Sequence, residues 1–495
     1  MTHTHSNGGA PKGQDLRGAA RRTFLKQGLG LGAMAMAAME AKASPLTRIA
    51  QESPRPSPML PKKPPLPAKA KRVLYLSMSG APPQHDMFDP KPKLDQLDGT
   101  LCPDEFLEGR RLAFIKGRPK LLGSPHPSSI VDPLGTRITD QMPHFREYAK
   151  DVCLVRSMYT DQFNHAPAEM LLYTGNQTVG KPSIGSWATW GLGSMNQDLP
   201  GFVVLVSGGS DPTGGKSLWS SGFLPSEYQG VRLRSAGDAV LYVSDPKGLS
   251  RPMRRRMLDV LKGLNEDDHG RHGDPETLAR IAQYELAYRM QLSVPEVTDL
   301  TKETPETLER YGAKPGEASF AANCLLARNL LKSDVRFVQL YDWGWDIHGT
   351  GAGDDLITKY PEKCKETDRP IAALMKDLGD SGLLEDTLVV WGGEFGRTPM
   401  LEARGGSKFL GRDHQPNCFT MWLAGAGIKK GYVHGETDEL GATVATDGVS
   451  VRDLQATILH LLGFDPERMR FPFQGLDQRL IGPSHGPRVV KEILS

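Results

Sequence analysis

Residues 341–350 read Tyr-Asp-Trp-Gly-Trp-Asp-Ile-His-Gly-Thr, and they contain candidate functional side chains at the end of a predicted strand. The preceding residues, 335–340, form an apolar run that predicts a buried or half-buried strand. Asp346 and His348 stand two apart, so an extended backbone would point both side chains the same way. A carboxylate and an imidazole together at a strand end suit a divalent metal of the Zn, Mn or Fe type. A turn with a hydrogen-bonded Asp–His pair would explain the same residues.

The composition is that of a globular protein with balanced charge. The 495 residues are 38% hydrophobic and 24% charged, which favours a soluble globular protein over a disordered chain or a set of membrane spans. This length suggests two or three domains, or one large elaborated domain. The net charge is only +2, from 60 lysines and arginines against 58 aspartates and glutamates. Such a balance gives no electrostatic reason to expect a nucleic acid or a membrane surface as partner.

The first residues have the pattern of an export signal. Residues 21–26, Arg-Arg-Thr-Phe-Leu-Lys, form a twin-arginine signature, and an apolar segment too short to span a bilayer follows. Residues 41–43, Ala-Lys-Ala, match a signal-peptidase site. We therefore expect a signal peptide over 1–43, a proline-rich linker over 44–71 and one folded domain over 72–495. The protein would be exported folded to the periplasm or beyond, with no transmembrane helix in the mature chain.

The cysteine pattern does not indicate a zinc ribbon or a disulfide scaffold. The five cysteines are widely separated, and none forms a CxxC pair. Cys153 and Cys418 lie in apolar runs, so we expect them to be buried free thiols.

Strands and helices are predicted to alternate along the chain. Apolar runs predict strands over 73–78, 152–158, 201–206, 240–243, 335–340, 387–391 and 419–424. Helical patterns cover 140–150, 168–173, 274–292, 305–311, 318–331, 368–378 and 451–462. A basic run at residues 251–256 is expected to solvate one end of a helix. The alternation favours an α/β fold, with a mostly parallel central sheet and helices on both faces.

Charged clusters flank several of these strands. Three follow a predicted strand and a fourth precedes one: His85/Asp86/Asp89, Asp342/Asp346/His348, Glu394/Arg397 and Arg412/Asp413/His414. Open parallel sheets place their chemistry at the carboxyl ends of the strands. Carboxylates and imidazoles there would hold a metal, and the planar fork of an arginine would bind an oxyanion.

The order of these motifs resembles the alkaline phosphatase-like superfamily, which includes sulfatases and cofactor-independent phosphoglycerate mutases. More closely, the chain looks like the exported family DUF1501 from about residue 72 to about 476. The resemblance rests on residues 88–92 (FDPKP), 345–348 (WDIH), 393–399 (GEFGRTP), 411–414 (GRDH) and 435–438 (GETD). It implies an alkaline phosphatase-like α/β fold with a divalent metal, Zn, Mn or Ca, at the carboxyl edge of the sheet.

The resemblance also implies roles for single residues. Asp346 and His348 match the Asp…His metal pair that follows a central strand in the superfamily, and His414 looks like its late metal-binding histidine. Glu394 occupies the place of the aspartate in the sulfatases' Ser-Asp-His/Asn-Gly segment. Asp86 looks like the first-strand carboxylate. His85 could serve in its place, and Asp342 could orient His348 from outside the site as easily as it could bind the metal itself.

One departure concerns the nucleophile. Residues 165–175 resemble the sulfatase signature with its proline, threonine and glycine in register, but His165 stands where the nucleophile should be. No cysteine can become formylglycine there, and no hydroxyl takes the phosphatase place. His165 could be a metal ligand, a general base or a nucleophile. Ser157 or Thr160 could supply a hydroxyl, and a metal-activated water is another route.

The resemblance thus implies an exported metal-dependent hydrolase of a phosphate or sulfate ester, acting on a small molecule or a polysaccharide. Arg397 or Arg412 would neutralise charge on the substrate oxyanion. One alternative is a non-catalytic metal- or glycan-binding protein that retains the fold, in which tryptophans 219, 343 and 345 could stack on sugar rings. A structural partner in the cell envelope is another.

Overall fold

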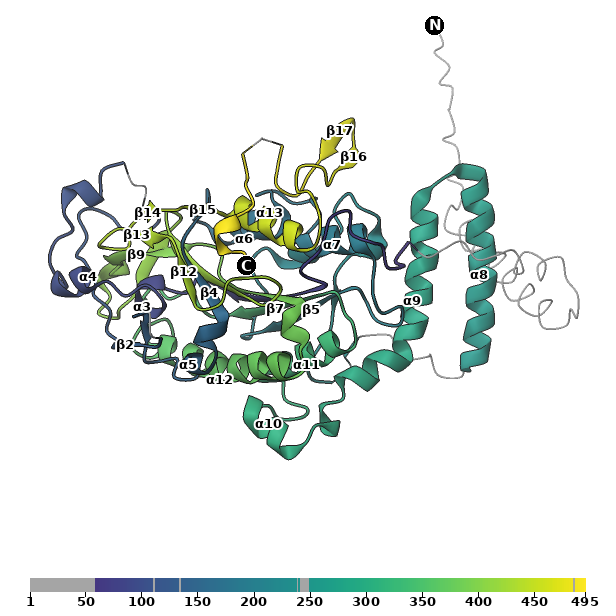
Figure 1. Ribbon diagram of the computed structural model, residues 1–495, viewed down its shortest axis with the longest axis horizontal. Coiled ribbons are helices and arrows are strands. Elements are labelled where there is room, and N and C mark those ends of the chain that lie inside the picture. The colour runs from purple at the N-terminus through teal and green to yellow at the C-terminus, as the bar shows by residue number, and fades with distance from the viewer. Residues whose placement is uncertain (1–57, 110–111, 133–134, 238, 241–248, 484–485) are drawn as a thin grey trace, which may run out of the picture. The chain divides into compact units, whose positions relative to one another are not determined.

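The computed structural model describes residues 58–109, 112–132, 135–237, 239–240, 249–483 and 486–495. Within these residues, nine strands form one large sheet (Figure 1). Its order is β12-β4-β11-β8-β1-β7-β5-β6, and β15 also pairs with β4. These strands are β1 (Arg72–Ser79), β4 (Val152–Tyr159), β5 (Phe202–Ser207), β6 (Val231–Arg232), β7 (Phe337–Trp343), β8 (Thr387–Gly392), β11 (Phe419–Ala424), β12 (Tyr432–His434) and β15 (Val449–Ser450).

The predicted mostly parallel sheet is confirmed. β1 pairs in parallel with β7 on one side and with β8 on the other. β5 and β6 continue the parallel pairing beyond β7. Among these strands, only β11 runs antiparallel to its neighbours, β8 and β4. Because β1, β7 and β8 run in one direction, their carboxyl ends meet at the same edge of the sheet.

Helices cover both faces of the sheet, as predicted (Figure 1). On one face lie α6 (His165–Thr174), α7 (Ile184–Leu192) and α13 (Val451–Leu461); on the other lie α5 (Phe145–Tyr148), α11 (Phe320–Lys332) and α12 (Lys359–Asp380). Side chains alternate between the two faces along each strand. Accordingly, Leu74 and Leu76 of β1 belong to the apolar core that includes α11 and α12, whereas Val73 and Tyr75 belong to the core that includes α7 and α13.

Further helices and strands lie outside this framework. They are α3 (Gln84–Met87), α4 (Pro92–Gln96), α9 (Pro275–Thr298), α10 (Pro305–Tyr311), β2 (Ser128–Ile130), β3 (Arg137–Thr139), β9 (Gly396–Leu401), β10 (Arg412–Gln415), β13 (Glu436–Thr437), β14 (Val444–Thr446), β16 (Phe471–Phe473) and β17 (Leu476–Gln478). β9 and β10 pair antiparallel in a two-stranded ribbon that is separate from the main sheet.

Helix α8 (Arg251–His272) belongs to a separate compact unit. The Ser250 side chain accepts a hydrogen bond from the backbone N–H of Met253, and Gly273 ends the helix in the left-handed conformation with φ 71°. The basic run at residues 251–256 occupies the first turns of this helix, as predicted.

The prediction of a helix over residues 140–150 was largely wrong. Of residues 140–150, only Phe145–Tyr148 are α-helical, and a short 3₁₀ turn follows. Pro143 has no N–H to donate, and the backbone N–H of His144 is taken by the carboxylate of Asp368 at 2.7 Å. This contact with a distant residue, together with Pro143, therefore replaces the first helical turn.

Some expectations concern residues outside the described ranges. The signal peptide over 1–43, the first part of the linker over 44–71 and most of the strand over 240–243 fall there. Cys153 is a buried free thiol, as expected. Across the described residues, we find no helix with the length and apolar character needed to cross a membrane.

Candidate metal centre

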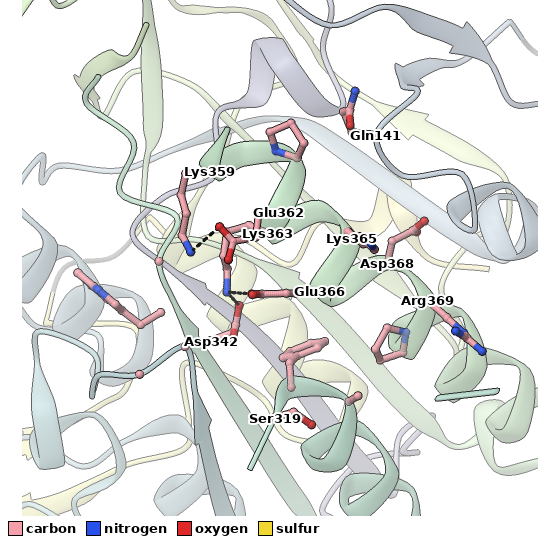
Figure 2. A pocket seen from close by; sticks show the side chains of 18 of the residues that line it. Gln141, Ser319, Asp342, Lys359, Glu362, Lys363, Lys365, Glu366, Asp368 and Arg369 are labelled. Atoms are coloured by element: carbon pink, nitrogen blue, oxygen red, sulfur yellow. Dashed lines mark hydrogen bonds and ion pairs between the residues drawn. The ribbon is translucent and has the colours of Figure 1, made fainter. Parts of the chain in front are cut away.

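A cavity of about 1690 Å³ opens where the carboxyl end of β7 meets the N-terminal half of α12. Asp346 and His348 line it near the end of β7. Figure 2 shows residues that line it, among them Lys363, whose side chain points to Asp342 and Glu366. A cavity of this size at a strand-end edge is where ligands bind in open α/β sheets.

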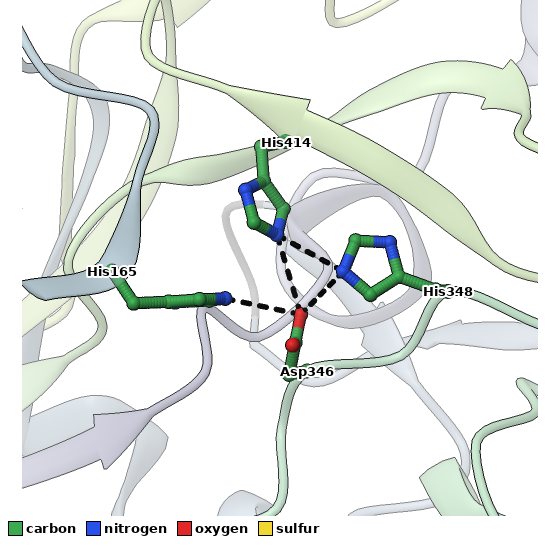
Figure 3. Close-up of side chains that lie close together, drawn as sticks. All are labelled: His165, Asp346, His348 and His414. Carbon is green, nitrogen blue, oxygen red and sulfur yellow. Dashed lines mark hydrogen bonds and ion pairs between the residues drawn. The ribbon is translucent and has the colours of Figure 1, made fainter. Parts of the chain in front are cut away.

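Four of the predicted site residues meet at this edge (Figure 3). One ligand atom each from His165, Asp346, His348 and His414 lies within 4.8 Å of the others. His165 is the first residue of α6, the next two follow β7, and His414 lies on β10. We call these four residues the cluster.

The cluster is organised around one oxygen atom. Asp346 Oδ1 lies 3.2 Å from His165 Nε2, 2.8 Å from His348 Nε2 and 3.3 Å from His414 Nε2. The Nε2 atoms of His348 and His414 are 3.1 Å apart. Three imidazole nitrogens and a carboxylate oxygen therefore face one point, although they come from three separate segments.

The opposite nitrogen of each imidazole contacts an acceptor. His165 Nδ1 lies 2.5 Å from Glu394 Oε1, His414 Nδ1 lies 2.7 Å from the Phe163 carbonyl oxygen, and His348 Nδ1 contacts Glu402 Oε2. In a neutral imidazole, an Nδ1 that donates its proton to such an acceptor leaves the Nε2 lone pair directed into the cluster.

This arrangement fits a divalent cation. Outward Nδ1–H donors are the usual way in which proteins orient metal-binding histidines. Moreover, His165 Nε2 is buried and has no hydrogen-bond partner of acceptable geometry among the described residues. Nitrogen lone pairs that face each other without protons repel, and a cation between them removes that cost. His165, Asp346, His348 and His414 are thus the residues that could hold a metal.

Contacts within the cluster shift its protonation equilibria. Burial would raise the pKa of Asp346, but Arg397 and the three histidines hold it far below its usual range. Burial lowers the pKa of His414 to about 3, and the charge of Arg397 adds to this. The pKa of His165 is raised to about 9 against the effect of burial, because Asp346 and Glu394 contact its ring nitrogens. A metal would therefore displace a proton from His165 on binding.

Two glycines allow the backbone segments to approach closely. Gly80, at the end of β1 with φ 105°, lies where a Cβ would come 2.5 Å from the backbone nitrogen of Asp346. At Gly411, before β10, a Cβ would come 1.9 Å from the carbonyl carbon of His348. Any side chain at either position would separate the strands that carry the cluster.

Arg397 is buried beside the cluster, and four of its five N–H donors already have acceptors. Its guanidinium donates to the carbonyl oxygens of Ala81, Gly80 and Arg412, and it lies 2.6 Å from Asp346 Oδ1. Only about 1% of its side chain is exposed. Arg397 therefore orients Asp346, which differs from the substrate-binding role expected from the sequence.

The sequence also suggested Asp86 or His85 for the metal site and Arg412 for the oxyanion, and the structure brings none of them into the cluster. Arg412 donates to both carboxylate oxygens of Asp86, at 2.7 and 3.0 Å, and neither side chain is exposed. His85 Nε2 lies 3.0 Å from the Leu440 carbonyl oxygen. Asp86 and Arg412 therefore neutralise each other, and the short helix α3 directs Asp86 and His85 to partners outside the cluster.

Glu394 lies next to the cluster without joining it. One carboxylate oxygen contacts His165 Nδ1 and also accepts the backbone N–H of Gly80 at 3.0 Å. It thus orients a cluster histidine, although the sequence suggested that it would be a ligand itself. Asp342 does not contact His348; its carboxylate binds Lys363 and Ser207.

Three residues near the cluster were not found from the sequence. Glu402 orients His348, Arg404 donates to Glu402, and Phe114 packs edge-on against two cluster histidines. Glu402 and Arg404 lie within five residues of the GEFGRTP motif, which is the one signal that could have drawn attention to them. Nothing in the sequence around Phe114 distinguishes it.

Comparison with solved structures finds distant similarity. The chain is 11% identical to the lipoteichoic acid synthase LtaP from Listeria monocytogenes, with 88% of this chain and 80% of that one covered and a TM-score of 0.35. For the PsFucS1 sulfatase from Pseudoalteromonas sp., the identity is 12%, 80% of this chain and 68% of that one are covered, and the TM-score is 0.33. For the alkaline phosphatase from the Antarctic bacterium TAB5, the identity is 12%, 73% of this chain and 92% of that one are covered, and the TM-score is 0.28. Similarity at this level assigns no reaction.

Sequence comparison is more specific. No curated protein matches the chain. A family model described as "Protein of unknown function (DUF1501)" matches residues 70–494, which is most of the chain and agrees with the resemblance seen in its motifs. The protein is therefore a member of the DUF1501 family.

Proposed function

We propose that this protein is a metal-dependent hydrolase of phosphate or sulfate esters. One observation carries the proposal: three imidazoles, each anchored through Nδ1, direct Nε2 with Asp346 Oδ1 to one point at the edge of a large cavity. The motif order that resembles the alkaline phosphatase-like superfamily supports it. A bound divalent metal would supply a Lewis acid for an ester oxygen and for water.

The donor set favours particular metals. Three nitrogens and one carboxylate oxygen suit Zn or Mn, whereas Ca takes oxygen ligands almost exclusively. Of the metals expected from the sequence, we therefore favour Zn or Mn.

The chain's own residues would orient these ligands. Glu394, Glu402 and the Phe163 carbonyl fix the three imidazoles, and Arg397 fixes Asp346. If His165 is a ligand, it is not available as a nucleophile. Ser157 is committed elsewhere, because its hydroxyl donates to the Asp447 carbonyl at 2.6 Å. The buried Thr160 hydroxyl has no hydrogen-bond partner among the described residues, so we infer that either a water molecule or Thr160 attacks the ester.

Export and an extracellular substrate belong to the same proposal. The twin-arginine pattern supports transport of a folded, metal-loaded protein to the periplasm or beyond. A small-molecule or polysaccharide ester would reach the cluster through the cavity.

The first experiment is metal analysis by mass spectrometry on protein purified without chelator, followed by turnover of aryl phosphates and aryl sulfates. We expect about one Zn or Mn per chain. Replacing both Asp346 and His348 by alanine should remove the metal and the turnover. His126→Ala is the matched control, because its Nε2 contacts the Leu356 carbonyl outside the cluster. Retained stoichiometric metal in the double variant would contradict the ligand assignment.

A non-catalytic metal- or glycan-binding protein is the second candidate. The observation that favours it is His165, which points into the cluster from the position where a sulfatase signature has its nucleophile. Binding of a sulfated polysaccharide by metal-loaded protein that turns over no ester would support this candidate over the hydrolase.

A further inference from the structure

Arg404 is an exposed cation at the edge of the cluster. It lies in the connection between β9 and β10 and lines the same cavity as Asp346 and His348. About 39% of its side chain is exposed. Its Nε donates to Glu402 Oε1 at 2.6 Å, and one terminal nitrogen lies 3.2 Å from His348 Nδ1. The guanidinium is thus held beside a cluster histidine while part of it faces solvent.

Phe114 packs against this guanidinium. The Arg404 guanidinium carbon lies 3.9 Å from the centre of the Phe114 ring, a cation–π distance. The same ring meets His348 and His414 edge-on, with ring centres 5.3 and 5.4 Å apart. The backbone N–H groups of Phe114 and Ile115 donate to Asp413 Oδ2 at 2.8 and 3.0 Å, so this segment is tied to β10.

The other arginines near the cluster cannot receive a ligand. Arg397 and Arg412 are each about 1% exposed or less, and their donors go to carbonyl oxygens and to carboxylates. Lys363, which also lines the cavity, pairs with Asp342 and Glu366. Of these four cations, Arg404 alone combines an exposed guanidinium with contact to a cluster histidine.

The charge around the cluster limits what Arg404 can accept. Four carboxylates and two guanidiniums lie in the cluster or beside it. The carboxylates are those of Asp346, Glu394, Glu402 and Asp413, and the guanidiniums are those of Arg397 and Arg404. With neutral histidines, a bound divalent cation would bring the net charge of these six side chains to zero. Of the cations that contact the cluster or its carboxylates, Arg404 is the exposed one, so a second negative charge on a ligand bound there finds no further partner beside the cluster.

We propose that Arg404 binds the anionic oxygens of the ester and that the site prefers a singly charged tetrahedral group to a doubly charged one. The substrate class is then a sulfate monoester or a phosphodiester, in preference to a phosphate monoester. This inference rests on the proposed ester hydrolysis but can be tested by binding alone. The planar guanidinium suits two oxygens of such a group.

The binding test uses two non-hydrolysable probes of matched shape, benzenesulfonate and phenylphosphonate, at a mildly alkaline pH where the second carries two charges. Calorimetric titration of metal-loaded wild-type protein should show tighter binding of benzenesulfonate. Arg404→Ala should weaken that binding about 10- to 100-fold, the range for a lost hydrogen bond to a charged group. Arg470→Ala is the control, an exposed arginine that pairs with Asp477.

Metal content is measured in every variant. If Arg404→Ala loses metal, Arg404→Gln, which can still donate to Glu402, takes its place. Equal binding of benzenesulfonate by wild type and by a metal-loaded Arg404 variant overturns the role of Arg404. Tighter binding of phenylphosphonate by wild type overturns the charge preference, and so does the absence of binding of either probe.

Turnover separates this inference from the proposed function. Phenyl sulfate, diphenyl phosphate and phenyl phosphate are compared as substrates, and the first two distinguish the sulfate from the phosphodiester class. If none is hydrolysed but benzenesulfonate still binds through Arg404, ester hydrolysis fails and the inference stands. Hydrolysis with an unchanged KM in Arg404→Ala would overturn the inference and leave the hydrolase intact.

Discussion

The ammonium of Lys363 lies 2.6 Å from Asp342 Oδ2, and both side chains are at most 2% exposed. The same carboxylate accepts hydrogen bonds from the Ser207 hydroxyl at 2.8 Å and from the indole N–H of Trp345 at 3.3 Å. Asp342 is in β7, and Asp346 follows it by four residues. This buried pair therefore fixes the segment that leads into the cluster.

We expect Lys363→Ala to destabilise the protein by about 3–5 kcal/mol, because it leaves Asp342 buried without its cation. Urea denaturation measures the loss. The double variant Lys363→Met with Asp342→Asn removes both charges and should lose clearly less than the single variant. Equal losses in the two would show that the ion pair is not the source of the effect.

Orientation of His348 by Glu402 can be tested through metal affinity. Glu402→Gln removes the charge that faces His348 Nδ1, and we expect metal affinity to fall about 10- to 100-fold. Competition with a fluorescent chelator gives the affinity. Glu362→Gln is the control, since Glu362 lines the same cavity and pairs with Lys359. An unchanged affinity in Glu402→Gln would mean that this contact does not orient the imidazole.

The close approach at Gly411 predicts a severe effect from one methyl group. A Cβ there would come 1.9 Å from the His348 carbonyl carbon, so Gly411→Ala must move β10 or the segment after β7. We expect loss of bound metal and a lower melting temperature. Gly351→Ala should have no such effect, because a Cβ at that position meets nothing within 4 Å. A Gly411→Ala protein with normal metal content would contradict this packing.

Asp368 predicts a pH dependence of stability. Burial raises the pKa of Asp368 from 3.8 to about 6. Between these values the folded protein holds a proton that the unfolded chain releases, so the free energy of unfolding falls as pH rises through this window. The fall amounts to at most about 3 kcal/mol. Asp368→Asn should therefore gain stability relative to wild type between pH 4 and pH 7, measured by urea denaturation at both values. A pH-independent difference would exclude this cause.

Asp86 distinguishes a structural ion pair from a metal ligand. Asp86→Ala leaves Arg412 buried without its partner, and we expect a loss of about 3–5 kcal/mol in the free energy of unfolding. The folded fraction should keep its full metal content. Loss of metal from protein that remains folded would restore Asp86 as a ligand candidate.

The main strands could be predicted because their apolar runs are bounded by glycine and polar residues. The strand predicted over 419–424 has the observed bounds, and those over 73–78 and 387–391 are each one residue short at one end or both. The same reasoning placed Asp346 and His348 at the carboxyl edge of a parallel sheet. Glycine after a helical pattern was equally informative, since Gly175 ends α6 with φ 71°.

The contacts between distant segments could not be predicted. Arg412 and His414 are two apart on β10, and regular alternation would point them to one side. The register with β9 shifts between them, and Arg412 binds Asp86 while His414 joins the cluster. Glu402 stands 54 residues from His348 in the sequence, and its contact with that imidazole depends on how the ribbon folds back. No local pattern encodes either arrangement.

The ribbon formed by β9, β10 and their connection carries Arg397, Glu402, Arg404 and His414, which together contact the other three cluster residues. If the protein has the proposed function, metal affinity and substrate choice would therefore be coupled. A longer or shorter connection between these strands would change the contacts to a ligand and the coordination geometry in the same step. Variants with an altered connection should then change both properties together, while the main sheet stays unchanged.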